Sequence, residues 1–238
     1  MGRGKLKTAV ILAGGLGTRL RPLTLKKPKA LLPLQGKPIV EHIFYWLKLY
    51  KINHVVLAVC NLKEQIIDYY KDGSKFGLKI DYLKENVPMG TAGCVKLGKN
   101  YLKETFLCSH ADEVKDININ EWFEFHKKNK ALVSIALTKI DNPSAYGVAK
   151  MDGDKIIEFV EKPKKGTEPS NLINSGTYII EPEVLNMIPD GHAMWEYDVF
   201  PRIAKLGRLY GFVFPGQWFD IGNMQKYKRC EKLWKGIK

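Results

Sequence analysis

Residues 8–22 read Thr-Ala-Val-Ile-Leu-Ala-Gly-Gly-Leu-Gly-Thr-Arg-Leu-Arg-Pro, an apolar run that leads directly into a glycine-rich segment. The run Thr8–Leu12 has the length and composition of a strand that is buried on both faces of a parallel sheet. Glycines let a backbone adopt positive φ values and bring its N–H groups close to phosphate oxygens. Gly14, Gly15 and Gly17 therefore predict a phosphate-binding loop after a buried strand.

The residues after these glycines narrow the type of phosphate site. Thr18 adds a hydroxyl donor, and Arg19 adds a forked guanidinium group that fits phosphate oxygens. A Walker loop is excluded because the chain contains no Gly-Lys followed by Ser or Thr. The dinucleotide fingerprint is excluded as well, because Leu20 stands where its third glycine is required.

The first half of the chain alternates between strand and helix patterns. Short apolar runs predict strands, and apolar residues at three- and four-residue steps predict helices. Strands are expected at 8–12, 54–60, 78–83, 105–109 and 131–137, and helices at 38–50, 62–70, 91–102 and 119–130. Such alternation implies βαβ units with right-handed crossovers and a mostly parallel sheet.

The pattern changes at about residue 140. Strands are expected at 146–151, 155–160 and 173–180, followed by helices at 182–187, 197–205 and 223–234. Consecutive strands joined by turns predict an antiparallel segment. We therefore predict an α/β fold, a Rossmann-like and mostly parallel sheet flanked by helices, with a small antiparallel β insertion.

Composition limits the partners of this chain. Its 238 residues carry 38 Lys and Arg against 25 Asp and Glu, a net charge of +13. The lysines are spread along the chain and no basic run is interleaved with aromatic residues, which favours small polyanionic ligands over nucleic acid. No apolar run reaches the roughly 18–20 residues of a membrane helix, and the N-terminal residues do not resemble a signal peptide. We expect a cytoplasmic protein without a membrane partner.

The four cysteines lie far apart and form no CxxC pair, so neither a zinc site nor a redox motif is predicted. In a reducing compartment such residues are expected to be buried free thiols.

Residues 9–24, together with Lys27-Pro-Lys-Ala-Leu-Leu-Pro33, resemble the signature of the sugar-1-phosphate nucleotidyltransferases. This family includes guanylyl-, uridylyl- and thymidylyltransferases. Matching segments recur in order to about residue 228, so the resemblance covers nearly the whole chain. It implies one domain over 1–238, with a nucleotide-binding half at about 1–140, a sugar-phosphate-binding half at about 141–222 and a C-terminal helix at 223–238. The antiparallel insertion then lies on the acceptor side.

The resemblance also implies a reaction and its cofactor. A sugar 1-phosphate and an NTP would give an NDP-sugar and pyrophosphate, with Mg²⁺ as the cofactor. Arg19, Lys29 and Asp112 match the catalytic positions, with Arg19 on the leaving pyrophosphate and Lys29 on the α-phosphate. Asp112 and Asp220 match the two metal-binding aspartates.

Nucleotide-binding residues follow from the same matches. They are Leu12, Ala13, Gly14, Gly15, Gly17, Thr18, Glu85, Gly90 and Thr91. Glu85 falls where a base-pairing side chain is expected, and a carboxylate only accepts hydrogen bonds. It suits the two adjacent N–H donors of guanine better than the single N–H of uracil or thymine, which favours GTP.

One segment departs from the family pattern. Ser109-His-Ala-Asp112 stands where the family usually carries Asn-Gly-Asp, which changes the local backbone shape. We interpret His110 as a contact to phosphate or solvent rather than as a metal ligand.

On the acceptor side, the matching sugar-phosphate-binding residues are Gly147, Glu161, Lys162 and Asn174. Glu161 would accept hydrogen bonds from sugar hydroxyls, Lys162 would bind the phosphate, and Asn174 would orient the sugar. We interpret Trp195-Glu-Tyr-Asp198 as mainly structural, with Asp198 as a cap.

Several functional alternatives stay open within and outside the family. Mannose-1-phosphate guanylyltransferases are the preferred match, with glucose-1-phosphate uridylyl- or thymidylyltransferases as the alternative and heptose or N-acetylmuramate 1-phosphate as further acceptors. A non-catalytic nucleotide-sugar-binding module is the rival class, but it is expected to lack some of the charged residues Arg19, Lys29, Asp112 and Asp220. We expect a catalytic module without the β-helix of larger relatives, and a homodimer is left open.

Overall fold

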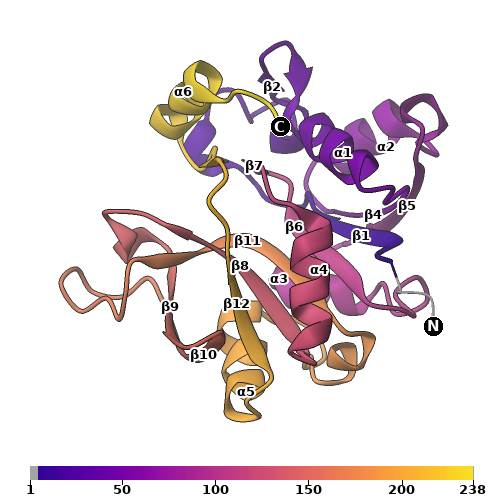
Figure 1. Ribbon diagram of the computed structural model, residues 1–238. Helices are drawn as coiled ribbons and strands as arrows, with labels where there is room; N and C mark the ends of the chain where they lie inside the picture. Colours follow the sequence, from indigo (N-terminus) through magenta and orange to yellow (C-terminus); the bar gives the residue numbers. More distant parts are fainter. Residues whose placement is uncertain (1–4, 238) are drawn as a thin grey trace. The chain divides into compact units, whose positions relative to one another are not determined.

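The computed structural model describes residues 5–237, which group into two compact units. We call residues 7–88, 109–117 and 216–237 the N-terminal unit, and residues 5–6, 89–108 and 118–215 the central unit. Both contain strands and helices, which confirms the predicted α/β class (Figure 1). Among residues 5–237, no helix combines the length and apolarity that crossing a membrane requires.

The N-terminal unit is built on three parallel strands. Strand β4 (His54–Val59) pairs with β1 (Thr8–Leu12) on one side and with β5 (Lys79–Lys84) on the other. Helices α1 (Ile39–Leu49) and α2 (Lys63–Tyr70) follow β1 and β4 in sequence. Parallel neighbouring strands need a crossover connection, which is usually a helix. The alternation of strand and helix patterns in the sequence therefore corresponds to this arrangement.

Two short strand pairs and a final helix complete this unit. Strands β2 (Pro33–Leu34) and β3 (Lys37–Pro38) form a small hairpin. Strand β7 (Glu113–Lys115) pairs antiparallel with β13 (Trp218–Asp220), and α6 (Met224–Leu233) follows. The pairing of β7 with β13 joins segments about a hundred residues apart, which no local pattern could indicate.

A single apolar cluster joins these pieces of the N-terminal unit. It contains Leu20, Leu32, Leu34, Ile39, Val114, Ile221, Cys230 and Trp234, all buried. Their burial provides the hydrophobic free energy that holds loop, hairpin, β7, β13 and α6 in place.

The central unit is mainly antiparallel. Its strands are β8 (Val133–Lys139), β9 (Gly147–Asp152), β10 (Lys155–Glu161), β11 (Leu172–Ile180) and β12 (Leu209–Val213), arranged in the order β11-β8-β12-β10-β9. Only β8 and β12 pair in parallel, and β9 also meets β11. This group is the expected antiparallel insertion together with the strands that carry it.

Helices of the central unit are short. They are α3 (Gly90–Lys96), α4 (Ile119–Lys128) and α5 (Phe200–Lys205), with 3₁₀ turns at Pro143–Ala145 and Pro182–Asn186 and a π-helical turn at Trp195–Val199. Helix α4 lies beside β12 (Figure 1). The rings of Trp122 on α4 and Phe212 on β12 stack with their centroids 5.9 Å apart. Strand β6 (Phe106–His110) begins in this unit, and its last two residues belong to the N-terminal unit.

Some elements differ from the sequence-based expectation. The helix expected at 91–102 ends at Lys96, because the following residues, with Gly98 among them, form turns. The helix expected at 182–187 is a 3₁₀ turn, and that expected at 197–205 starts two residues earlier as a π-helical turn. Strand β12 was not predicted because Gly211 interrupts it, yet a Cβ there would lie 2.5 Å from Leu137 Cδ1.

A partly buried charged cluster follows β11 in the central unit. The carboxylate of Glu181 accepts hydrogen bonds from Thr105 Oγ1 and Lys127 Nζ, both at 2.8 Å, and lies 3.2 Å from His126 Nε2. Burial alone would raise the pKa of Glu181, but these hydrogen bonds outweigh it and lower the pKa to about 2. Burial also lowers the pKa of His126.

These shifts predict acid sensitivity. A carboxylate with a depressed pKa stabilises the fold above its ordinary pKa of 4.5 and loses that contribution as the pH falls towards about 2. We expect Glu181→Gln to lower the free energy of unfolding at pH 7 by about 1–3 kcal/mol. The variant should also show a weaker pH dependence below pH 4.5, measured by urea unfolding at several pH values.

The control is Glu183→Gln, because Glu183 is exposed on the next turn. Equal pH profiles for Glu181→Gln and the wild type would contradict the assignment.

Candidate active site

The glycine-rich loop follows β1 in the N-terminal unit and is closed by a side chain. Gly17 has a φ of 62°, and its carbonyl accepts a hydrogen bond from Thr24 Oγ1 at 2.7 Å. A Cβ at position 17 would lie 2.9 Å from Thr24 Cγ2. Glycine is therefore required here both by the backbone conformation and by the close approach of Thr24.

Glu85 lies against this loop. It follows β5, is 6% exposed, and its backbone is held by hydrogen bonds from its N–H to Val59 O at 2.9 Å and from Lys63 Nζ to its carbonyl at 3.0 Å. A Cβ on Gly14 would lie 3.1 Å from Glu85 Oε1. The fold thus brings Glu85 and Gly14 together, although 71 positions separate them in the numbering of the chain.

Lys29 and Asp112 form an ion pair. Lys29 begins a 3₁₀ turn (Lys29–Leu31) after Pro28, and Asp112 lies in the turn between β6 and β7. Burial would raise the pKa of Asp112, but the charges of Lys29 and His110 and a hydrogen bond from Lys29 lower it to about 2. The carboxylate is therefore ionised at neutral pH and Lys29 is held beside it.

Asp220 pairs with one cationic side chain and lies near a second. Its Oδ2 lies 2.7 Å from Lys226 Nζ in the first turn of α6. A Cβ on Gly222 would lie 2.9 Å from the same oxygen and 3.6 Å from Arg19 Nη2. The Arg19 guanidinium and the Asp220 carboxylate thus reach the same point above Gly222.

The antiparallel pairing of β7 with β13 makes the two aspartates backbone neighbours. Glu113 faces Asp220 in the register, and Ile221 donates its N–H to the carbonyl of Asp112 at 3.0 Å. Asp112 and Asp220 therefore lie on adjoining strand ends.

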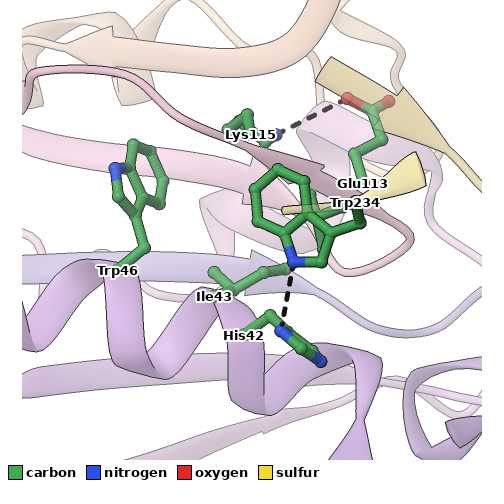
Figure 2. Close-up of a pocket in the computed structure, with 7 residues that line it drawn as sticks. His42, Ile43, Trp46, Glu113, Lys115 and Trp234 are labelled. Atoms are coloured by element: carbon green, nitrogen blue, oxygen red, sulfur yellow. Dashed lines mark hydrogen bonds and ion pairs between the residues drawn. The ribbon is translucent and has the colours of Figure 1, made fainter. Parts of the chain in front are cut away.

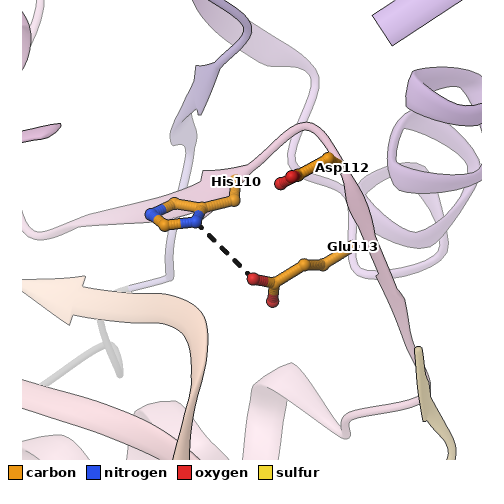
Figure 3. Close-up of side chains that lie close together, drawn as sticks. All are labelled: His110, Asp112 and Glu113. Atoms are coloured by element: carbon orange, nitrogen blue, oxygen red, sulfur yellow. Dashed lines mark ion pairs between the residues drawn. The ribbon is translucent and has the colours of Figure 1, made fainter. Parts of the chain in front are cut away.

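Two polar side chains lie close to Asp112. His110, Asp112 and Glu113 offer ligand atoms within 4.8 Å of one another (Figure 3). His110 Nδ1 lies 3.5 Å from Glu113 Oε1, so the ring also contacts a carboxylate.

Glu113 has further partners at its second carboxylate oxygen. Its other oxygen accepts a hydrogen bond from Trp218 Nε1 at 3.0 Å and lies 3.5 Å from Lys115 Nζ, a buried lysine (Figure 2). These contacts fix β7 and hence the position of Asp112.

The acceptor-side residues lie in the central unit. Gly147 on β9 faces Glu161 on β10, and Glu161 Oε1 accepts a hydrogen bond from Lys162 Nζ at 2.6 Å. The hydrogen bond and the charge of Glu161 raise the pKa of Lys162. A Cβ on Gly147 would lie 2.7 Å from Glu161 Oε2 and 2.4 Å from Phe159 Cζ, so a side chain there would displace the glutamate.

Asn174 belongs to a second hydrogen-bond network in this unit. Its Nδ2 donates to Tyr178 Oη at 2.9 Å, and that hydroxyl lies 3.5 Å from Glu196 Oε1. Thr91 Oγ1 donates to the other oxygen of Glu196 at 3.3 Å and accepts from Trp195 N at 3.2 Å. Strand β11, helix α3 and the π-helical turn thus meet at the buried carboxylate of Glu196.

Gly90 and Asp198 shape the same region. Gly90 has a φ of 75°, and a Cβ on it would lie 2.4 Å from Ala193 O. Asp198 Oδ2 accepts from Met194 N at 2.7 Å, so it caps the π-helical turn.

The family described as nucleotidyl transferase matches residues 8–234. This chain belongs to the nucleotidyl transferase family. The mannose-1-phosphate guanylyltransferase 1 of Arabidopsis thaliana is 39% identical over 226 residues, which are 92% of this chain and 62% of that protein. The chain spans 62% of the length of the curated relatives it matches.

Solved structures agree with the family. A Bacillus anthracis protein assigned as a glucose-1-phosphate thymidylyltransferase, solved with sucrose, has a TM-score of 0.88 at 26% identity and covers 97% of this chain and 96% of its own. HddC from Yersinia pseudotuberculosis, solved with GMP-PN, has a TM-score of 0.81 at 27% identity, covering 95% and 99%.

Sequence reasoning missed two residues of the polar clusters described above. Lys226 pairs with Asp220, and Glu196 joins Thr91 to Tyr178. The sequence does carry a signal for Lys226. It lies three residues after the N-cap Asn223, a helix position where glutamate or glutamine is favoured, so a lysine there is unusual. Glu196 lies in the segment interpreted as structural, and only the tertiary fold shows its partners.

The close approach at Gly147 gives a test of this site. We expect Gly147→Ala to lower the free energy of unfolding by about 1–3 kcal/mol, because its methyl group collides with Phe159 and Glu161. Gly15→Ala is the control for stability, because a Cβ at Gly15 meets nothing within 4 Å. Equal unfolding free energies for both variants, measured by chemical denaturation, would contradict the packing described.

Proposed function

We propose that this chain transfers a nucleotidyl group from an NTP to a sugar 1-phosphate, giving an NDP-sugar and pyrophosphate. The observation that carries the proposal is the gathering of Arg19, Lys29, Asp112 and Asp220 on one apolar cluster beside the glycine-rich loop. Family membership and the names of the relatives support it.

The proposed reaction needs charge neutralisation more than a base. An oxygen of the acceptor phosphate attacks the α-phosphorus in line, a new P–O bond forms, and the bond to the β-phosphate bridging oxygen breaks as pyrophosphate leaves. The attacking oxygen is already deprotonated, so catalysis rests on positioning and on stabilising the developing negative charge. Lys29 would act at the α-phosphate and Arg19 at the pyrophosphate.

The donor set fits magnesium. Asp112 and Asp220 supply carboxylate oxygens from adjoining strand ends, the ligand type that Mg²⁺ prefers. Bound Mg²⁺ would supply positive charge next to the phosphates. The low pKa of Asp112, about 2, keeps its oxygens available at neutral pH.

The acceptor residues have suitable chemistry in their own unit. Glu161 presents oxygens to hydroxyl donors, and Lys162 carries a positive charge that fits the acceptor phosphate. Asn174 is oriented by Tyr178 and by the N–H of Gly176, which donates to Asn174 Oδ1 at 2.8 Å. These contacts support binding of a sugar phosphate by the central unit.

Guanine is the base we propose. The carboxylate of Glu85 lies beside Gly14, and two acceptor oxygens match the N1–H and N2–H₂ donors of guanine. The guanylyltransferase relatives and the GMP-PN bound to HddC support GTP, and the relatives support mannose 1-phosphate. The thymidylyltransferase likeness supports the alternative of glucose 1-phosphate with UTP or dTTP.

We also propose a cytoplasmic location, which the four cysteines support. All four are free thiols, as expected in a reducing compartment.

Pyrophosphate release tests the proposal. We expect turnover with Mg²⁺ when GTP and mannose 1-phosphate are offered within a matrix of NTPs and sugar 1-phosphates. Lys29→Ala and Asp112→Ala should each lose at least about a hundredfold in kcat, because each removes a charge at the reacting phosphate. No turnover with any pair would refute the enzyme and favour a binding module, and turnover only with UTP or dTTP would refute the guanylyl choice.

Glu85 gives a separate test of the base. Glu85→Gln replaces one acceptor oxygen by an NH₂ donor, which faces a donor of guanine. We expect kcat/KM for GTP to fall roughly ten- to hundredfold while that for UTP or dTTP falls less. Glu64→Gln, at an exposed position on α2, is the matched control. An equal loss for every NTP would show that Glu85 does not read the base.

A further inference from the structure

Lys226 occupies an unfavourable place in its own helix. The side chain of Asn223 caps α6 by accepting from Lys226 N at 2.9 Å, which puts Lys226 in the first turn. The N-terminus of a helix carries the positive end of its dipole, so a cation there costs stability, by about 0.3–1 kcal/mol. A residue that breaks a local rule is expected to be compensated by a functional contact.

The compensating contact is Asp220. Lys226 Nζ lies 2.7 Å from Asp220 Oδ2, with exposed fractions of 30% and 17% for the two side chains. The equivalent contact on the neighbouring strand end is the pair of Lys29 with Asp112. Both proposed metal ligands therefore carry a lysine ammonium group on one carboxylate oxygen.

We propose that Lys226 is a counter-ion of Asp220. It pairs with Asp220 in the metal-free protein and is displaced from it when a divalent cation binds. This inference rests on the proposed role of Asp112 and Asp220 as metal ligands. Each of the two lysines neutralises the charge of one of these carboxylates while no metal is bound.

Exchange follows from the same geometry. Oδ2 of Asp220 accepts a hydrogen bond from Lys226, so a divalent cation must displace the ammonium group to use that oxygen. The lysine stem is flexible and its head group is partly exposed, which lets it move away without repacking the apolar cluster. Lys226 therefore weakens metal binding, and its released charge can approach a bound phosphate.

A purely structural ion pair makes the opposite prediction. If Lys226 only anchors α6, its removal would destabilise the helix and leave metal affinity unchanged or weaker. Metal affinity in the absence of substrates therefore separates the two roles.

The experiment is a titration of the full chain with Mn²⁺, with free Mn²⁺ followed by its electron paramagnetic resonance signal and no substrate present. We expect Lys226→Met to bind Mn²⁺ about three- to tenfold more tightly than the wild type. Lys226→Arg keeps the cation and should stay near the wild type. Lys228→Met, at an exposed position on the same helix, is the matched control and should not change the affinity.

Thermal unfolding with and without Mn²⁺ provides the second readout. Lys226→Met should melt below the wild type without metal and recover more on addition of Mn²⁺. Lys226→Gln, a smaller change, replaces it if the methionine variant does not fold.

The outcomes separate this inference from the proposed function. Unchanged or weaker Mn²⁺ binding by Lys226→Met, with binding that Asp220→Asn abolishes, overturns the counter-ion role alone. No Mn²⁺ binding by the wild type, or binding that survives Asp220→Asn, refutes the metal site itself. Loss of pyrophosphate release in every assay, with tighter Mn²⁺ binding by Lys226→Met, would refute the transferase and leave the exchange intact.

Discussion

A cluster of buried apolar side chains in the N-terminal unit, from Leu20 to Trp234, determines where the charged groups of the candidate site lie. Leu20 follows Arg19 directly, Ile221 follows Asp220, and Val114 is two residues after Asp112. Leu32 is three residues after Lys29. Because packing in such a core leaves little freedom, fixing these apolar residues also fixes their charged neighbours.

The charged groups then constrain one another. Asp112 is paired with Lys29 and Asp220 with Lys226, so each carboxylate lies next to a cation. These pairs are partly exposed, and exposed pairs contribute little net stability. In the proposed reaction their role would be positional, because they hold both signs of charge where a polyanionic ligand and a divalent cation would bind.

In the central unit, close backbone approaches and buried hydrogen bonds position the candidate residues. Close backbone approaches at Gly90 and Gly147, where a Cβ would lie 2.4 Å from its nearest neighbour, set the positions of Thr91 and Glu161. Buried hydrogen bonds around Glu196 then orient Tyr178 and Asn174. Such networks are costly when incomplete, which makes each partner a sensitive position for substitution.

The sequence by itself determined the buried strand Thr8–Leu12, the glycine-rich loop, the alternation of strands and helices up to about residue 139 and the family, because these depend on local periodicity and contiguous motifs. Only the tertiary structure decided which distant side chains meet. The antiparallel pairing of β7 with β13 joins Asp112 to the Asp220 strand, and a short strand of three residues carries too weak a local pattern to be predicted. The pairing of Lys226 with Asp220 and the contact of Glu85 with Gly14 arise in the same way, from long-range packing that no single segment encodes.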